Sequence, residues 1–319
     1  MKTNKASAAR RAQMQGVGLV ELMIALVLGL LVVGGAIGMF ISNRQTYSAT
    51  ESLGRVQENA RVAFELMARD IREAGGNPCA SSLPVADVIT PSAWQNSWNN
   101  GVTGYDNGGL AGSAAGTDAI EVKSGGSSGI GVTHNAGAST FTAASGGTAF
   151  KAGDLALVCD YRQAAIFMVA TATATAITYN TTARADGTKN CQTDFGLPVV
   201  CGGATKAYAF QPSTVITKLR SARWYVADNP RGGRSLYQSV DGLGAQEVVE
   251  GVRDMQLTYL MPGGADYVLA SAVPNWTQVL AVRITLNMEG GEGQERVGTD
   301  TAALRRELFH VVTLRNHSS

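Results

Sequence analysis

The most prominent pattern in the chain is a run of 20 residues, Leu22–Ile41, without a charged or strongly polar side chain. As an α-helix rising about 1.5 Å per residue, this run spans about 30 Å, the thickness of a bilayer's hydrocarbon core. Basic residues precede it and set the N-terminal side in the cytoplasm: Lys2, Lys5, Arg10 and Arg11. The pattern predicts a single-pass membrane anchor, with the rest of the chain in the periplasm or outside.

A helical period continues beyond the apolar run. Apolar residues recur at spacings of three and four, which places them on one helix face: Leu53, Val56, Ala60, Ala63, Met67, Ile71 and Ala74. Gly75-Gly76 and then Pro78 end the pattern. We therefore expect one helix from about Gly18 to Ala74, about 85 Å long. Its second half packs on the protein's own sheet or, as the alternative, in a coiled-coil stalk.

Short apolar and β-branched runs in the remainder predict strands: Asp118–Lys123, Leu155–Cys159, Ala164–Ala170, Ala176–Asn180, Val215–Leu219, Ala222–Ala227, Leu236–Ser239, Val279–Met288 and Leu308–Leu314. The run Val248–Leu260 predicts a helical turn through Met255 that continues as a strand. Residues 101–150 contain Gly, Ala, Ser or Thr at 34 of 50 positions, which predicts loops with a few short strands. The expected class is α+β, with one long helix on an antiparallel sheet and Gly/Ser/Thr-rich insertions.

The charge distribution gives no indication of a strongly basic nucleic-acid binder. Charged residues make up 16 % of the chain, and the formal net charge is +1. Without the four basic residues of the first 16 positions, 22 basic and 25 acidic residues remain, a net charge of −3. The basic charge is therefore a tag at the N-terminal end.

Four cysteines lie beyond the predicted helix: Cys79, Cys159, Cys191 and Cys201. An even number of widely spaced cysteines in a translocated domain favours disulfides. Of the three possible pairings, the spacing favours a local Cys191–Cys201 loop and a long-range Cys79–Cys159 bond. Buried free cysteines are the alternative. A metal site is not expected, because no C-x-x-C spacing occurs and the histidines are scattered.

Three kinds of segment are compatible with the N-terminal pattern. A cleaved secretory signal has a shorter apolar core followed by an A-x-A-like site, whereas Ser42–Gln45 follows here. A plain membrane anchor leaves Glu21 unexplained, because an acid beside an apolar run is unfavourable without a partner. The third possibility is a segment that is processed on its cytoplasmic side and keeps the apolar run.

Gly16-Val17-Gly18-Leu19-Val20-Glu21-Leu22-Met23 resembles the class III signal of type IV prepilins. The resemblance implies cleavage by a prepilin peptidase between Gly16 and Val17, and N-methylation of Val17. It also implies that Glu21, the fifth residue after cleavage, docks subunits by pairing with the new α-amine. Val17 stands where major pilins usually carry phenylalanine. The implied organisation is a leader at 1–16, a transmembrane and rod helix at 17–76, and a head at 77–319.

The C-terminal half carries a second resemblance. Val249–Leu257, Val279–Leu286 and Phe309–Asn316 look like the PilW-type minor pilins of bacterial type IV pili, and more distantly like the J-type minor pseudopilins of type II secretion. The resemblance implies a minor pilin that primes pilus assembly, near the pilus tip. Implied partners are other minor pilins, the major pilin, the peptidase, the inner-membrane assembly platform and the lipid bilayer. The implied location is the inner membrane, then the pilus surface.

No catalytic or nucleotide-binding motif was found, so an enzyme and a cofactor are not expected. Tyr105–Gly108 fits a turn better than a calcium loop, and His310 fits a structural strand position better than a base. Trp94 and Trp98, four apart, either pack over the sheet or form a glycan-binding patch. Two functions remain open: an assembly subunit, and an adhesin or DNA-uptake module that uses residues 80–245.

Overall fold

The computed structural model describes residues 18–79, 83–96, 98, 101–125, 129–290 and 305–316. A single long helix, α1 (Leu19–Glu73), opens this part of the chain. It begins and ends within one residue of the expected limits, Gly18 and Ala74. The helix up to Glu51 belongs to one compact unit, and the chain from Ser52 belongs to a second unit, the head.

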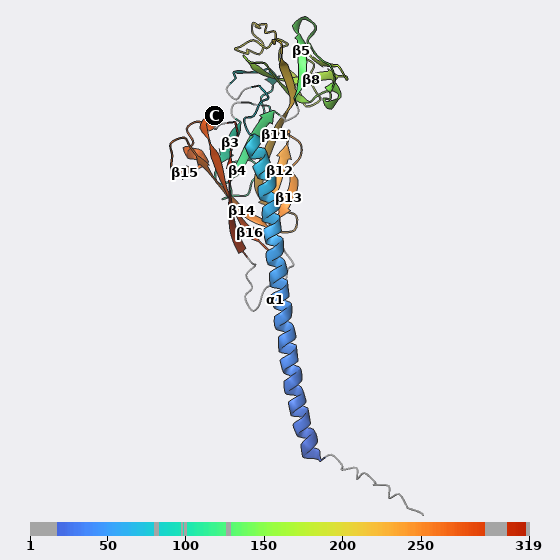
Figure 1. The fold of residues 1–319 in the computed structure, drawn as a ribbon, viewed down its shortest axis with the longest axis vertical. Helices are drawn as coiled ribbons and strands as arrows, with labels where there is room; N and C mark the ends of the chain where they lie inside the picture. Colours follow the sequence, from blue (N-terminus) through green and yellow to red (C-terminus); the bar gives the residue numbers. More distant parts are fainter. Residues whose placement is uncertain are drawn as a thin grey trace, which may run out of the picture. The chain divides into compact units, whose positions relative to one another are not determined.

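Strands form most of the head (Figure 1). The strands before residue 200 are β1 (Val85–Asp87), β2 (Ile89–Thr90), β3 (Val102–Tyr105), β4 (Ala119–Gly125), β5 (Ile130–Asn135), β6 (Thr140–Ala143), β7 (Leu155–Cys159), β8 (Ala164–Ala172), β9 (Ala176–Tyr179) and β10 (Lys189–Asn190). The later strands are β11 (Thr214–Asp228), β12 (Arg234–Val240), β13 (Gln246–Glu250), β14 (Val252–Leu260), β15 (Tyr267–Val268), β16 (Ala281–Glu289) and β17 (Arg305–Thr313). Short 3₁₀ helices lie at Ala136–Ala138, Gly147–Ala149, Ala270–Ala272 and Trp276–Gln278.

Strand β11, 15 residues long, connects two parts of the largest sheet. Its first residues pair with β5 and β7, and its later residues pair with β4 and β12. A separate four-stranded sheet has the order β15-β14-β16-β17. Among the strand pairs of the described chain, β1 and β8 run parallel and the others antiparallel. The head is therefore an almost entirely antiparallel β structure.

The second half of α1 packs on this head. The predicted apolar stripe is buried from Val56 through Ala74, with Ala63, Met67 and Ile71 fully enclosed, while Leu53 is half-buried. Facing it are inward side chains of both sheets, including Trp224 on β11 and Tyr259 on β14. The stripe thus meets the protein's own sheets, which confirms the predicted α+β arrangement and excludes the coiled-coil alternative for these residues.

A second core lies in the part of the large sheet formed by β5 to β9. Aromatic side chains dominate it: Phe141, Phe167, Tyr179, Phe195 and Phe210. The Phe141 and Phe167 rings stack with their centroids 5.4 Å apart, and the Phe167 and Tyr179 rings meet edge to face at 5.4 Å. Aromatic pairs of this kind bury much apolar surface per residue. This part of the head therefore has its own hydrophobic support, separate from the core under α1.

One expectation about local structure was wrong. The predicted helical turn from Val248 to Met255 is extended, because β13 and β14 cover this segment on either side of Gly251, whose φ is +80°. A register shift between Val252 and Asp254 places Val252 and Met255 on the same buried face although they are three apart. This bulge imitates a helical period. The described part of residues 101–150 forms loops with the short strands β3, β4, β5 and β6, as expected.

Candidate functional site

The first half of α1 exposes its apolar side chains. Leu30 is 71 % exposed and Phe40 is 70 % exposed, and the other large apolar residues between Leu19 and Ile41 are also at the surface. Within the described residues, α1 is the one helix long and apolar enough to cross a membrane. Exposing such a surface to water is unfavourable, whereas contact with lipid or with other apolar helices is favourable. The segment is consistent with a single-pass membrane anchor.

The expected processing site lies at the start of this helix. Gly16 and Val17 fall outside the described residues, so cleavage and methylation there remain predictions. Glu21 lies in the first turn of α1, where the exposed backbone N–H groups of a helix favour negative charge. Its position at the edge of the apolar surface fits a docking role, which also remains a prediction.

A buried carboxylate fixes α1 to the head. Asp70 is 7 % exposed, although it lies on the helix face that packs on the sheet. It accepts hydrogen bonds from Trp224 Nε1 at 2.9 Å, Gln238 Nε2 at 2.8 Å and Arg220 Nη2 at 3.1 Å. A buried charge is tolerated when it is paired and fully hydrogen-bonded in this way. Asp70 was not predicted from the sequence, where the only signal is an acid next to the stripe residues Met67 and Ile71.

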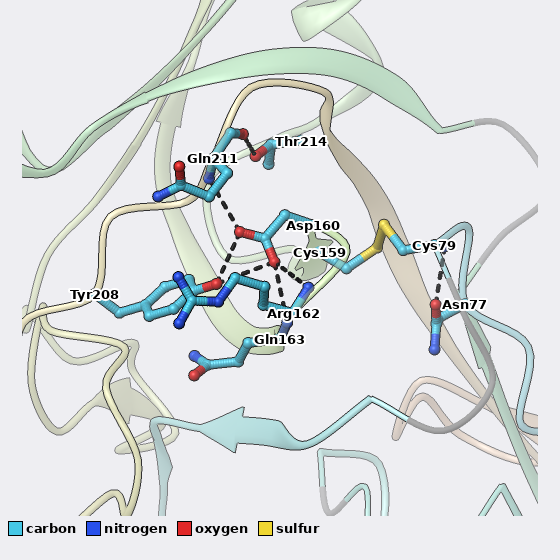
Figure 2. The surroundings of a disulfide bond; sticks show 9 residues. All are labelled: Asn77, Cys79, Cys159, Asp160, Arg162, Gln163, Tyr208, Gln211 and Thr214. Carbon is cyan, nitrogen blue, oxygen red and sulfur yellow. Dashed lines mark hydrogen bonds between the residues drawn. A yellow bond between two sulfur atoms is a disulfide. The ribbon is translucent and has the colours of Figure 1, made fainter.

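A second buried carboxylate lies next to a disulfide. Asp160 accepts hydrogen bonds from the backbone N–H groups of Arg162, Gln163 and Gln211 and from the Tyr208 hydroxyl (Figure 2). Burial alone raises the pKa of Asp160, but these four donors outweigh it and lower that pKa below its usual value. The carboxylate therefore joins the turn between β7 and β8 to the segment before β11.

Both disulfides have the pairing that the spacing favours. Cys79 is bonded to Cys159, with the Cα atoms 6.0 Å apart, and Cys191 to Cys201, with the Cα atoms 5.3 Å apart. Figure 2 shows the first bond beside Asp160, at the end of β7. It connects the segment that follows α1 to the large sheet. The second closes a short loop whose start is held by a Cys191 N–H to Val88 carbonyl bond of 2.7 Å.

His134 lies among the aromatic residues of the second core. Its Nδ1 accepts a hydrogen bond from the Phe210 N–H at 3.2 Å, so the ring proton of the neutral form is on Nε2, 2.7 Å from the Tyr179 hydroxyl. The ring stacks on Phe141 with the centroids 4.5 Å apart. Burial lowers the pKa of His134 to about 4. His134 is therefore neutral and joins Phe210 to Tyr179 through its two ring nitrogens. Both nitrogens are occupied, so neither is free for catalysis.

A polar pocket of about 600 Å³ opens beside the start of β7. Its charged side chains include Asp154, Lys218 and Asp241, and Leu155 and Leu243 contribute apolar surface. Lys218 Nζ lies 2.6 Å from Asp154 Oδ2. Mixed charges and small apolar patches suit a polar ligand better than a lipid or an apolar cofactor. No group of three or more His, Cys, Asp or Glu side chains in the described residues is arranged to hold a metal.

Hydrogen bonds to backbone N–H groups fix the turn at Tyr105–Gly108 and engage the carboxylate of Asp106. Asp106 accepts from the Ala270 N–H at 3.0 Å and from the Ser271 N–H at 2.8 Å. The Asn107 N–H donates to Asp118 at 2.9 Å. These bonds support the interpretation as a structural turn, because both oxygens of Asp106 are engaged by the backbone.

The other residues singled out from the sequence also make packing contacts. The Arg223 guanidinium lies 3.9 Å from the ring centroid of Trp94, and Trp98 packs on the small core beside β7 and β8. His310 lies on β17 with its ring 5.5 Å from that of Phe64 on α1. Packing therefore accounts for both tryptophans and for His310.

Comparisons with known proteins give little further information. No protein-family model matches the sequence, and no curated protein matches it. One solved structure that matches is a type IV-like pilin from Thermus thermophilus, with 11 % sequence identity and a TM-score of 0.32, covering 83 % of this chain and 98 % of that chain. A superposition of this degree assigns neither a family nor a function.

Proposed function

We propose that this chain is a type IV pilin-like subunit that enters a filament from the membrane. The observation that supports this most is the division of α1 at the edge of the head. The residues from Leu19 to Ile41 expose an apolar surface, whereas those from Val56 to Ala74 are buried by the protein's own sheets. In such a helix the first half is held by lipid and the second half is packed into the head. The first half can therefore pass from lipid into a bundle of similar helices while the head stays folded.

Within this class, we propose a minor pilin that helps to prime assembly near the pilus tip. The support is the resemblance of residues 249–257, 279–286 and 309–316 to PilW-type minor pilins. The partners proposed with this role are other minor pilins, the major pilin, the prepilin peptidase and the inner-membrane assembly platform. The proposal places the head in the periplasm before assembly and assigns the chain no enzymatic activity.

The test is complementation of a deletion strain. Deletion is expected to reduce surface piliation strongly, and the wild-type gene is expected to restore it. Gly16→Asp is expected to leave the leader uncleaved and to fail to restore pili, while Gly18→Ala serves as a control that preserves the glycine before the cut. Normal piliation in the deletion strain, or full function of the Gly16→Asp protein with its leader intact, would contradict the proposal. Loss of protein secretion with normal pili would favour a type II pseudopilin.

A binding function for the head is a second candidate, supported by its separate aromatic core and by the polar pocket. The pocket lies in the part of the chain, residues 80–245, that the resemblance does not cover. Lys218→Glu reverses a charge at its wall and disrupts the 2.6 Å pair with Asp154. For a tip adhesin, this variant is expected to leave piliation intact and to reduce attachment to host or abiotic surfaces. Unchanged attachment would count against the pocket as the binding site.

A further inference from the structure

The two ends of the Cys79–Cys159 bond differ in their access to solvent. Cys159, at the end of β7, is fully buried and lies between Ala164 of β8 and Val215 of β11. Cys79, in the segment after α1, is half-buried. Figure 2 shows the bond reaching from that segment to the end of β7. In the folded head, Cys79 is therefore the end of this bond that solvent reaches.

Apolar side chains surround the buried end. Cys159 belongs to a small core that it shares with five other buried residues: Ile89, Leu157, Ala164, Ile166 and Leu219. The thiolate is the reactive form of cysteine, and a charge in such surroundings is unfavourable. Cys159 is therefore a poor site for the first attack on a foreign disulfide. It is nevertheless well placed to attack a sulfur that is already bonded to Cys79, because the two Cα atoms are only 6.0 Å apart.

The pairing follows the order of the four cysteines along the chain. The first is bonded to the second and the third to the fourth, with separations of 80 and 10 residues, and no cysteine is free. In a chain that emerges from its N-terminal side, Cys79 can pair first with Cys159. Cys191 then finds no other free thiol until Cys201 follows. Such a pattern requires oxidation of the thiols but no rearrangement of wrong pairs.

We propose that a thiol–disulfide oxidase forms the Cys79–Cys159 bond through a mixed disulfide on Cys79. The Cys79 thiolate attacks the disulfide of the oxidase and releases one oxidase thiolate. The Cys159 thiolate then attacks the Cys79 sulfur, closes the native bond and releases the second oxidase thiolate. The chain loses two electrons, the oxidase gains them, and the two protons of the substrate thiols end on the oxidase thiols.

The partner is thus an oxidised dithiol protein, and Cys79 and Cys159 have different roles toward it. Such oxidases act where proteins form disulfides, for example in the periplasm, which is where the proposed function places the head. The inference goes beyond that function, because it concerns how the head is oxidised and not how the chain assembles. Because the pairing is consecutive, the oxidase is expected to suffice without a disulfide isomerase.

The first test uses the reduced full chain in detergent micelles, with Cys191→Ser and Cys201→Ser so that one pair remains. In this background, Cys159→Ser keeps only the Cys79 thiol and Cys79→Ser keeps only the Cys159 thiol. Each is mixed with a purified, oxidised thiol–disulfide oxidase, and the covalent adduct is measured on non-reducing gels. The chain that keeps Cys79 is expected to form the adduct at least about tenfold faster.

Oxidised glutathione in urea provides the matched control for this comparison. Unfolding exposes both thiols, so the two single-thiol chains are expected to react with glutathione at rates within about twofold of each other. The second test mixes the reduced wild-type chain with the oxidase and no isomerase. Mass spectrometry of disulfide-linked peptides is expected to find the two native pairs in at least about 90 % of the product.

Tryptophan fluorescence shows whether each reduced chain is folded. Equal adduct rates of the two folded chains, or a faster reaction at Cys159, would overturn the role of Cys79. Equal rates in reduced chains that do not fold would overturn it as well, because oxidation would then precede the burial of Cys159. Wrong pairs that persist until an isomerase is added would show that the oxidase does not suffice. None of these outcomes affects the assembly function, which piliation of the complemented strain tests separately.

Discussion

The Asp70 carboxylate on α1 accepts a 2.9 Å hydrogen bond from the Trp224 indole N–H on β11, 154 residues away in the chain. Trp224 is fully buried, and Gln238 on β12 donates to the same carboxylate oxygen. The helix and two strands of the head thus meet at one acceptor. The contact therefore holds the C-terminal half of α1 on the two strands β11 and β12.

We expect Asp70→Ala to lower the free energy of unfolding by about 3 kcal/mol. The substitution leaves the buried Trp224 donor and the half-buried Gln238 donor without their acceptor, and an unsatisfied buried group costs about 1–3 kcal/mol. Asp70→Asn keeps one acceptor oxygen and should lose less. Denaturant unfolding of the full chain in detergent micelles, followed by tryptophan fluorescence, measures the effect. Asp228→Ala, which breaks an exposed pair with Arg234, is the control, expected to change stability by under about 0.5 kcal/mol. Equal effects at Asp70 and Asp228 would contradict the anchoring role.

The two disulfides should contribute unequally to stability. Cys79 and Cys159 are 80 residues apart, and Cys191 and Cys201 are 10 apart. In the chain-entropy model the longer loop contributes about 4.5 kcal/mol and the shorter about 3 kcal/mol. Paired serine substitutions, measured by denaturant unfolding, should therefore show the larger loss for Cys79 and Cys159. A larger loss for the short loop would show that local packing, and not loop closure, determines the contribution.

The parts predicted well from the sequence are those with a strong period or a fixed spacing. The limits of α1 and its buried stripe follow from the 3.6-residue repeat, and β7 from a compact apolar run. The joined strand β11 was predicted as two strands, because Arg220 and Ser221 between them are polar. In the fold both polar side chains have partners: Arg220 pairs with Asp70, and the Ser221 hydroxyl donates to the Gln95 carbonyl at 2.7 Å. A sequence pattern cannot show that distant partners satisfy polar groups inside a strand.

Apart from Asp118–Lys123, the short strands of residues 101–150 were not placed individually, for a related reason. Strands β5 and β6 place few large side chains in the core, with Phe141 as the main one. The two strands are only six and four residues long and lie among Gly-, Ala-, Ser- and Thr-rich segments, so their alternation is too short to mark them as strands. Their pairing with β11 and β9 depends on long-range contacts, as does the network around Asp160. The two disulfides and the apolar half of α1 could be predicted from the sequence. The buried carboxylates Asp70 and Asp160 could not.

His134 should make the head less stable in mild acid. An unfolded histidine takes up a proton near pH 6.5, whereas the folded side chain has a pKa of about 4. Between these values the unfolded chain binds more protons, so stability falls as the pH decreases from 6.5 to 4 and is fully present above 6.5. The loss at pH 5 should be about 1 kcal/mol, since the side chain is only partly buried.

The measurement is the unfolding free energy of wild type and His134→Gln at pH 7.5 and pH 5.0. Glutamine does not titrate, so the variant should lose less stability between the two pH values whatever its stability at pH 7.5. His310→Gln, on β17 and outside the aromatic core, is the control for the loss of a histidine as such. The same pH dependence in His134→Gln as in wild type would mean that other groups cause the acid effect.

Glu21 provides the prediction that links the sequence most directly to assembly. Before cleavage the Val17 nitrogen is an uncharged amide, so Glu21 has no ammonium partner at that position. Cleavage after Gly16 produces the amine, and the pair can form as the subunit leaves the membrane. Removing the carboxylate makes the apolar run more apolar, so insertion should be unaffected. Cleavage depends mainly on Gly16 and should also continue.

Glu21→Ala should therefore insert and mature normally but fail to join its partner subunits. Without the carboxylate, the amine of a neighbouring subunit enters an apolar helix bundle unpaired, and breaking a buried ion pair in this way costs several kcal/mol. The measurement is recovery of co-purifying subunits with the tagged protein from detergent-solubilised membranes, together with mass spectrometry of the mature N-terminus. Glu58→Ala removes a glutamate from the head half of the same helix and should retain the partners. If Glu21→Ala recovers as many partner subunits as wild type and supports normal piliation, another contact determines docking, because the carboxylate would then be dispensable after cleavage.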